Sequence, residues 1–209
     1  AVRALGSCEC WLVLSPKRNR PPGLKGGCVS AEGSQGGRDG VCIVPASSGI
    51  KGRAEMSPAE HAGLVRAFSE VGGNIDTLIV ETAAGISDSV VSFSRASQEV
   101  LVVVCDEPAS ITDAYALIKL LSREHGQQRF RVLANMTHSP SEGKELFTKI
   151  TRVTDRFLEV TLDYMGAIPH DAYVRNAVQR QRAVVDAYPA CTASQAVTQM
   201  AKVADKCHR

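Results

Sequence analysis

The 209-residue chain lacks the long apolar segments of membrane and secreted proteins. Its longest apolar run, Val100 to Cys105, has the length of a strand, far below the ~20 residues that cross a bilayer. Val2 to Leu14 is interrupted by Arg3, Glu9 and cysteines, and therefore does not have the form of a signal peptide. These absences lead us to expect a cytoplasmic protein.

Motifs for metal-dependent and nucleophilic catalysis are also missing. The five histidines show no H-x-x-x-H spacing, and the seven cysteines offer only one close pair, the C-x-C of Cys8 and Cys10. No nucleophile elbow of the G-x-S-x-G type occurs. No G-x-G-x-x-G follows a first strand, which argues against a Rossmann dehydrogenase.

The charge balance does not indicate a nucleic-acid partner, because a net charge of +2 is too small to attract one. Residues 1–40 differ from the rest by holding six Lys/Arg against three Asp/Glu, while the remainder holds 18 against 19. Seven of the 17 glycines lie between Gly23 and Gly40, and no helical or strand periodicity is present beyond Leu24. We therefore predict an irregular glycine-rich segment over 1–40 and a globular domain over 41–209.

From residue 41 the chain alternates between short apolar runs and amphipathic stretches. Strands are predicted at 41–45, 76–81, 99–105, 130–135 and 160–169, and helices at 57–71, from Ser87 or Asp88, from Ser110, from Ser139 or Ser141, and as two short C-terminal helices split near Pro189. Six successive apolar residues within 99–105 predict a strand that is buried on both faces. Such alternation predicts an α/β fold with a mostly parallel sheet and helices on both faces.

Ligands of such sheets bind at the carboxyl ends of the strands, where four residues stand out. Glu81 ends a predicted buried strand and either holds Mg²⁺ or caps a neighbouring helix. Gly85 could let the backbone approach a phosphate. Asn135 either offers a donor and an acceptor to a base edge or satisfies the following turn. Pro169 either contacts adenine through its ring or simply ends its strand.

One glycine-rich segment, Gly23 to Ser30, begins like a phosphate-binding loop. Such a loop closes on Gly-Lys-[Ser/Thr] between a buried strand and a helix. Here Cys28-Val29-Ser30 replaces that ending, and neither flanking element is predicted. We therefore do not assign this segment to phosphate binding.

Residues from about 41 to 200 resemble the MinD/ParA class of deviant Walker ATPases, and within it the MinD-like regulators of flagellar number, the FleN/FlhG type. The likeness is carried by VCIVPASSG (41–49), LIVETAAGISDSVVSF (78–93), EVLVVVCDEPASITDAYALIKLL (99–121), FRVLANM (130–136) and MGAIPHDAYVRNAVQRQRAVV (165–185). The resemblance implies a P-loop NTPase fold, ATP and Mg²⁺ as cofactors, and an ATP-dependent homodimer. It also implies a flagellar transcription activator and flagellar assembly proteins as partners.

The same resemblance assigns roles to the strand-end residues. Glu81 falls where the family has its Walker B aspartate near Mg²⁺, Thr82 to Gly85 fall at the switch that senses the γ-phosphate, and Asn135 and Pro169 fall at the adenine. The family's K-G-G-x-G-K-[ST] loop is not found, so we expect an N-terminally incomplete chain. The resemblance also implies peripheral contact with the inner membrane in a full-length form, through an amphipathic C-terminal helix. Residues 195–209 do not show such a helix, because their apolar face is too small for stable membrane binding.

A second interpretation is a pseudo-ATPase that binds a partner protein without hydrolysing ATP. The missing phosphate loop favours it. The glutamate at position 81 favours it as well, because its side chain is one methylene longer than the aspartate of the family.

Overall fold

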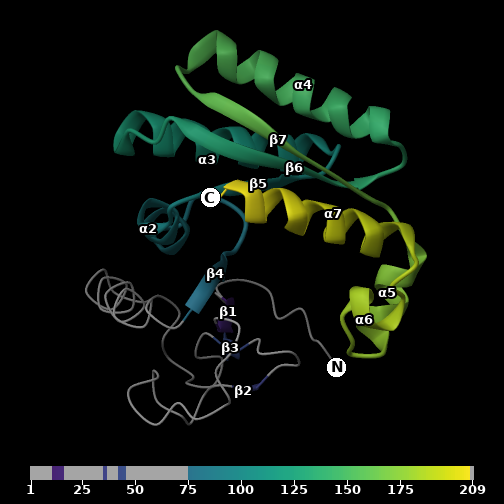
Figure 1. The fold of residues 1–209 in the computed structure, drawn as a ribbon. Coiled ribbons are helices and arrows are strands. Elements are labelled where there is room, and N and C mark those ends of the chain that lie inside the picture. Colours follow the sequence, from purple (N-terminus) through teal and green to yellow (C-terminus); the bar gives the residue numbers. More distant parts are fainter. Residues whose placement is uncertain (1–10, 17–34, 37–41, 46–74, 208–209) are drawn as a thin grey trace, which may run out of the picture. The chain divides into compact units, whose positions relative to one another are not determined.

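The computed structural model describes residues 11–16, 35–36, 42–45 and 75–207. They fall into two units, which we describe separately: an N-terminal unit that ends at Ala96 and a C-terminal unit that begins at Ser97 (Figure 1). The predicted helix at 57–71 and the segment from Gly23 to Ser30 lie outside the described residues. Within the described ranges, no helix is long and apolar enough to cross a membrane.

The described residues of the N-terminal unit form a four-stranded sheet and the helix that follows it. Its elements are β1 (Trp11–Pro16), β2 (Gln35–Gly36), β3 (Cys42–Pro45), β4 (Ile75–Glu81) and α2 (Asp88–Ala96). The strand order is β2-β3-β1-β4, and β1 is antiparallel to both β3 and β4. The strands predicted at 41–45 and 76–81 are therefore present, but both pair with β1, a strand that the sequence analysis did not assign. The division of the chain at residue 40 stays a prediction.

The first predicted ligand-bearing strand, β4, differs from expectation in its burial. Among the described strands it lies at the edge of the sheet, and Ile79 is 56% exposed. The expectation of a buried strand before Glu81 is therefore wrong. An apolar run indicates a strand, but its burial depends on what packs against it.

The C-terminal unit is an α/β layer structure. It contains the strands β5 (Leu101–Val104), β6 (Arg129–Thr137) and β7 (Thr161–Pro169), and the helices α3 (Pro108–His125), α4 (Pro140–Phe157), α5 (Ala172–Gln179), α6 (Val184–Ala187) and α7 (Thr192–Cys207). The strands are parallel, in the order β5-β6-β7. Helices α4 and α7 lie on opposite sides of this sheet, which confirms the predicted fold class (Figure 1). The last helix, α7, has 16 residues and is not the short helix that we expected.

The core of this unit lies between the sheet and the helices α3 and α4. Its fully buried side chains include Val104, Ile118, Leu121, Phe130, Val132, Leu146 and Ile150. The prediction that residues 99–105 are buried on both faces is wrong, since Leu101 is 43% and Val103 51% exposed. The reason is that β5 is an edge strand with an alternating burial pattern, so only every second side chain enters the core.

The predicted N-cap residues can be compared with the residues at which the helices begin. Ser139 is the N-cap of α4, as one of the two predicted alternatives had it, and its hydroxyl accepts a hydrogen bond from the Glu142 N–H at 3.1 Å. The Glu142 carboxylate in turn accepts from the backbone N–H of His138. Ser110 is not a cap, because α3 already begins at Pro108; its hydroxyl accepts from the Cys105 N–H at 3.0 Å.

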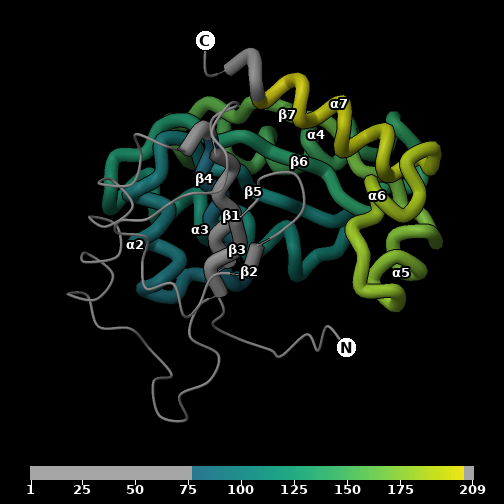
Figure 2. Tube along the Cα trace, turned by 60° about the horizontal axis from the view of Figure 1, so that its bottom comes forward, coloured from purple at the N-terminus to yellow at the C-terminus, as the bar shows by residue number. Residues whose placement is uncertain are grey.

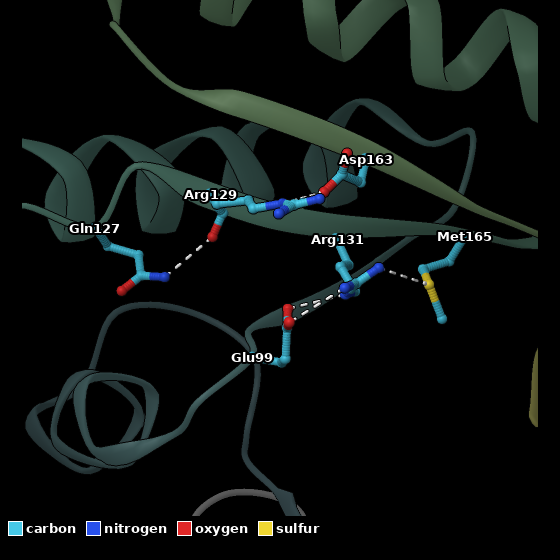
Figure 3. Close-up of polar contacts among 6 residues, drawn as sticks. All are labelled: Glu99, Gln127, Arg129, Arg131, Asp163 and Met165. Carbon is cyan, nitrogen blue, oxygen red and sulfur yellow. Dashed lines mark hydrogen bonds and ion pairs between the residues drawn. The ribbon is translucent and has the colours of Figure 1, made fainter. Parts of the chain in front are cut away.

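An ionic network lies near the amino ends of these strands (Figure 3). The Arg131 guanidinium donates to both carboxylate oxygens of Glu99, at 2.8 and 3.1 Å, and to the sulfur of Met165 at 3.7 Å. Arg129, two residues earlier on the same strand face, pairs with Asp163 at 2.6 Å. Since ligands of parallel sheets bind at the opposite ends of the strands, we assign this network to stability.

We expect the substitution Glu99→Ala to lower the free energy of unfolding by about 1–2 kcal/mol, because the Arg131 side chain is only 13% exposed and loses its bidentate carboxylate. This loss is smaller than that expected for a fully buried ion pair, because the Glu99 side chain is itself 37% exposed and solvent screens its charge. Urea denaturation measures it. The control is Asp163→Ala, which should have a clearly smaller effect because Arg129 is mostly exposed. Equal losses for the two variants would show that burial does not govern this network.

Candidate functional site

Two of the predicted ligand-binding residues lie together at the carboxyl edge of the parallel sheet. Asn135 of β6 is in register with Ile168 of β7, and Pro169, the last residue of β7, is in register with Thr137. The side chain of Asn135 is partly exposed. Because the two strands are neighbours and parallel, the amide and the proline ring are brought to one edge, as the sequence predicted.

The edge contains an irregularity that the sequence did not reveal. Met136 has φ of 57°, and the register of β6 against β7 shifts between Asn135 and Thr137. This is a β-bulge, in which one extra residue on one strand interrupts the pairing. Beyond it, the His170 N–H donates to the Thr137 carbonyl at 2.8 Å and closes the pairing of the strands.

The other predicted residues belong to the N-terminal unit. Glu81 is the last residue of β4 and is exposed, and Thr82 to Gly85 form the connection toward α2, which begins at Asp88. Gly85 has φ of +99°, a backbone conformation that favours glycine, so this turn needs a glycine. How this group is placed relative to Asn135 and Pro169 stays a prediction.

Sequence reasoning missed Asp171, which joins two helix starts at the same edge. Its carboxylate accepts the Tyr173 N–H at 2.9 Å as the N-cap of α5. It also accepts the Thr192 hydroxyl at 2.7 Å and the Ala193 N–H at 3.1 Å in the first turn of α7. The Thr192 hydrogen bond, followed by the two backbone N–H groups, lowers the pKa of Asp171 to about 2. The signal available in the sequence was an aspartate between a strand end and a helical pattern.

A shallow cleft of about 430 Å³ surrounds this carboxylate, lined by His170, Asp171, Ala172, Tyr173, Ala190, Cys191 and Thr192. It lies directly after Pro169, where Figures 1 and 2 both show α5 and α6 beyond the end of β7. The carboxylate of Asp171 already occupies the first turns of α5 and α7. The cleft therefore does not offer these helix starts to a further anion.

The described residues include no group of three or more His, Cys, Asp or Glu side chains placed to hold a metal ion. A single carboxylate such as Glu81 still suits Mg²⁺, which keeps several waters and takes its remaining ligands from substrate phosphates.

Comparison with known proteins identifies the family of the chain. No family model matches it. The antiactivator FleN of Pseudomonas aeruginosa is 57% identical over 201 residues, which are 96% of this chain and 72% of FleN. The chain belongs to the FleN family. This confirms the resemblance to MinD-like flagellar regulators that the sequence motifs suggested.

More distant relatives agree with this assignment. The flagellum site-determining protein YlxH of Helicobacter pylori is 29% identical over 78% of this chain and 55% of its own length. An uncharacterized ATP-binding protein of Methanocaldococcus jannaschii is 27% identical over 79% of this chain and 58% of its own length. The chain thus spans a little over half the length of these two relatives.

Among solved structures, the MinD cell division protein of Aquifex aeolicus superposes with a TM-score of 0.57. The match covers 70% of this member of the FleN family and 61% of MinD, at 21% sequence identity. At this identity the likeness establishes the fold, which confirms the P-loop NTPase architecture of the MinD/ParA type, and says nothing further about activity.

Proposed function

We propose that this chain is an ATP-binding regulator of flagellar number that restrains flagellar gene activation in the cytoplasm. The observation that carries the proposal is its 57% identity to the antiactivator FleN over 96% of the chain. The name of the second relative, a flagellum site-determining protein, supports the same cellular process. The expected partners are a flagellar transcription activator, flagellar assembly proteins and a second copy of the chain in an ATP-dependent dimer.

The proposed nucleotide site has a base half and a phosphate half. Asn135 would form hydrogen bonds with the adenine edge, and Pro169 would contact the ring. Glu81 would hold Mg²⁺ directly or through water, and Thr82 to Gly85 would respond to the γ-phosphate. Bound Mg²⁺ supplies positive charge that offsets the charge of the phosphates. The placement of Asn135 and Pro169 on neighbouring parallel strands supports the base half.

Deleting the gene should give cells with more flagella than the parent, because a restraint on flagellar gene activation is removed. Electron microscopy of negatively stained cells measures the number per cell. Wild-type protein should restore the parental number. The variant Asn135→Ala should fail to restore it at equal protein level, whereas Asn176→Ala, at an exposed position of α5, should restore it. An unchanged flagellar number in the deletion strain would refute the proposed role.

The glutamate at position 81 favours one alternative, a regulator that binds ATP without hydrolysing it. Phosphate release by the full-length gene product distinguishes the two, with Glu81→Asp as the matched variant. Hydrolysis by the wild-type protein would exclude the alternative. Binding of Mg-ATP without hydrolysis, with activity gained in Glu81→Asp, would establish it.

A further inference from the structure

Met136 has an unusual position for a large apolar residue. Its backbone φ of 57° is in the left-handed region, which side chains other than glycine, asparagine and aspartate rarely adopt. Met136 is 52% exposed, although it lies within β6, a strand with five buried residues. Both features are unfavourable for folding, so something other than packing must account for them.

The burial of the residues of β6 shows what the bulge does. Phe130, Val132 and Ala134 occupy every second position of β6 and are buried, and Leu133 between the last two is buried as well. Continuation of the two-residue spacing would bury Met136 next. After the bulge it is instead Thr137 that is buried, 2% exposed and in register with Pro169, and Met136 is left at the surface.

We propose that Met136 is the apolar platform for the purine ring of the bound nucleotide. The proposal rests on the proposed function, because it deepens the adenine site of Asn135 and Pro169. Met136 lies between the residues that pair with Ile168 and Pro169, at the strand ends where ligands of parallel sheets bind. A thioether makes favourable contacts with aromatic rings, whereas Asn135 can contact only the polar edge of the base.

If Met136 has this role, the substitution Met136→Gly should raise the stability of the protein and weaken its binding of the nucleotide. Glycine adopts a positive φ without strain, so the Tm should rise by about 1–4 °C despite the greater flexibility of the unfolded chain. The loss of the thioether should weaken the binding of a fluorescent ATP analogue by about 3- to 10-fold. A residue with a purely structural role would not improve stability while weakening binding.

The experiment uses the full-length gene product and two further comparisons. Met136→Leu keeps an apolar side chain of similar size and should bind the analogue within about twofold of the wild type. Inorganic tripolyphosphate, which has no base, should compete equally well in the wild type and in Met136→Gly. Weaker competition by tripolyphosphate in Met136→Gly would place the defect at the phosphates and overturn the proposal.

The remaining outcomes separate this proposal from the proposed function. If the wild-type protein binds the analogue and Met136→Gly binds it equally well, the platform role is wrong and the nucleotide site stands. If Met136→Gly loses both stability and affinity, Met136 supports the fold and the proposal is overturned. If the wild-type protein does not bind adenine nucleotides, the proposed nucleotide site fails, and the platform with it.

Discussion

Substitution of Gly143 with valine is expected to lower the free energy of unfolding by about 2–3 kcal/mol, through overpacking. Gly143 lies on the buried face of α4. A Cβ atom at this position would be 2.7 Å from the Ala167 Cβ and 2.7 Å from the Tyr164 hydroxyl oxygen, and 3.5 Å from the Ala134 Cβ. Tyr164 can turn aside, but the Ala167 Cβ is fixed to the backbone of β7. The helix would therefore have to move away from the sheet.

The matched control is Lys144→Val, at the next position of the same helix, where the side chain is exposed. It introduces a valine into the same helix without the contact with the sheet. Its expected cost is the lower helix propensity of valine relative to lysine, about 0.5 kcal/mol, whereas the exchange of glycine for valine does not lower the helix propensity. Urea denaturation of both variants separates the two terms. Similar losses in both would mean that α4 does not need a glycine to approach β6 and β7.

Gly143 illustrates how far the sequence predicts this fold. The periodicity of Leu146, Ile150 and their neighbours predicted α4 correctly, because one face of a packed helix must be apolar. A glycine inside that pattern only lowers confidence in the helix when the sequence is considered alone. Its packing role depends on Ala134 and Ala167, which belong to strands that the sequence cannot place at a given distance.

The strands show the same limit. The runs at 130–135 and 160–169 correctly predicted β6 and β7, whose parallel pairing follows from the helix between them. The run at 99–105 was expected to be buried on both faces, but the position of β5 at the sheet edge exposes Leu101 and Val103. Apolar content does not distinguish an edge strand from a central one.

At the candidate site, the sequence predicted the edge but not its geometry. Asn135 and Pro169 could be identified because residues at the carboxyl ends of parallel strands meet. The bulge at Met136 could not be identified, since methionine has no preference for a positive φ and no neighbouring glycine marks the position. The two helix starts that share Asp171 are 20 residues apart in the chain, Ala172 and Thr192, and only the fold brings them together.

Substitution of Asp171 with asparagine is expected to lower the Tm strongly at neutral pH, because one side chain serves the first turns of both α5 and α7. The Tyr173 N–H, the Thr192 hydroxyl and the Ala193 N–H are all donors, and the NH₂ group of asparagine would face one of them. The pKa of Asp171 is about 2 in the folded protein and near 3.9 in an unfolded chain. Its stabilising effect is therefore complete above about pH 5 and is lost as the pH falls from about 4 to about 2.

The difference in Tm between the wild type and Asp171→Asn should accordingly be constant from about pH 5 to pH 8 and shrink below pH 4, as the wild-type carboxyl takes up a proton. Asp155→Asn, at an exposed position of α4, is the control and should change the Tm little at any pH. Thr192→Val removes the first of the causes of the low pKa and should give a smaller loss in the same pH range. A Tm difference for Asp171→Asn that stays the same down to pH 2 would show that the negative charge of Asp171 does not stabilise the two helix starts. The two caps would then depend on shape and not on charge.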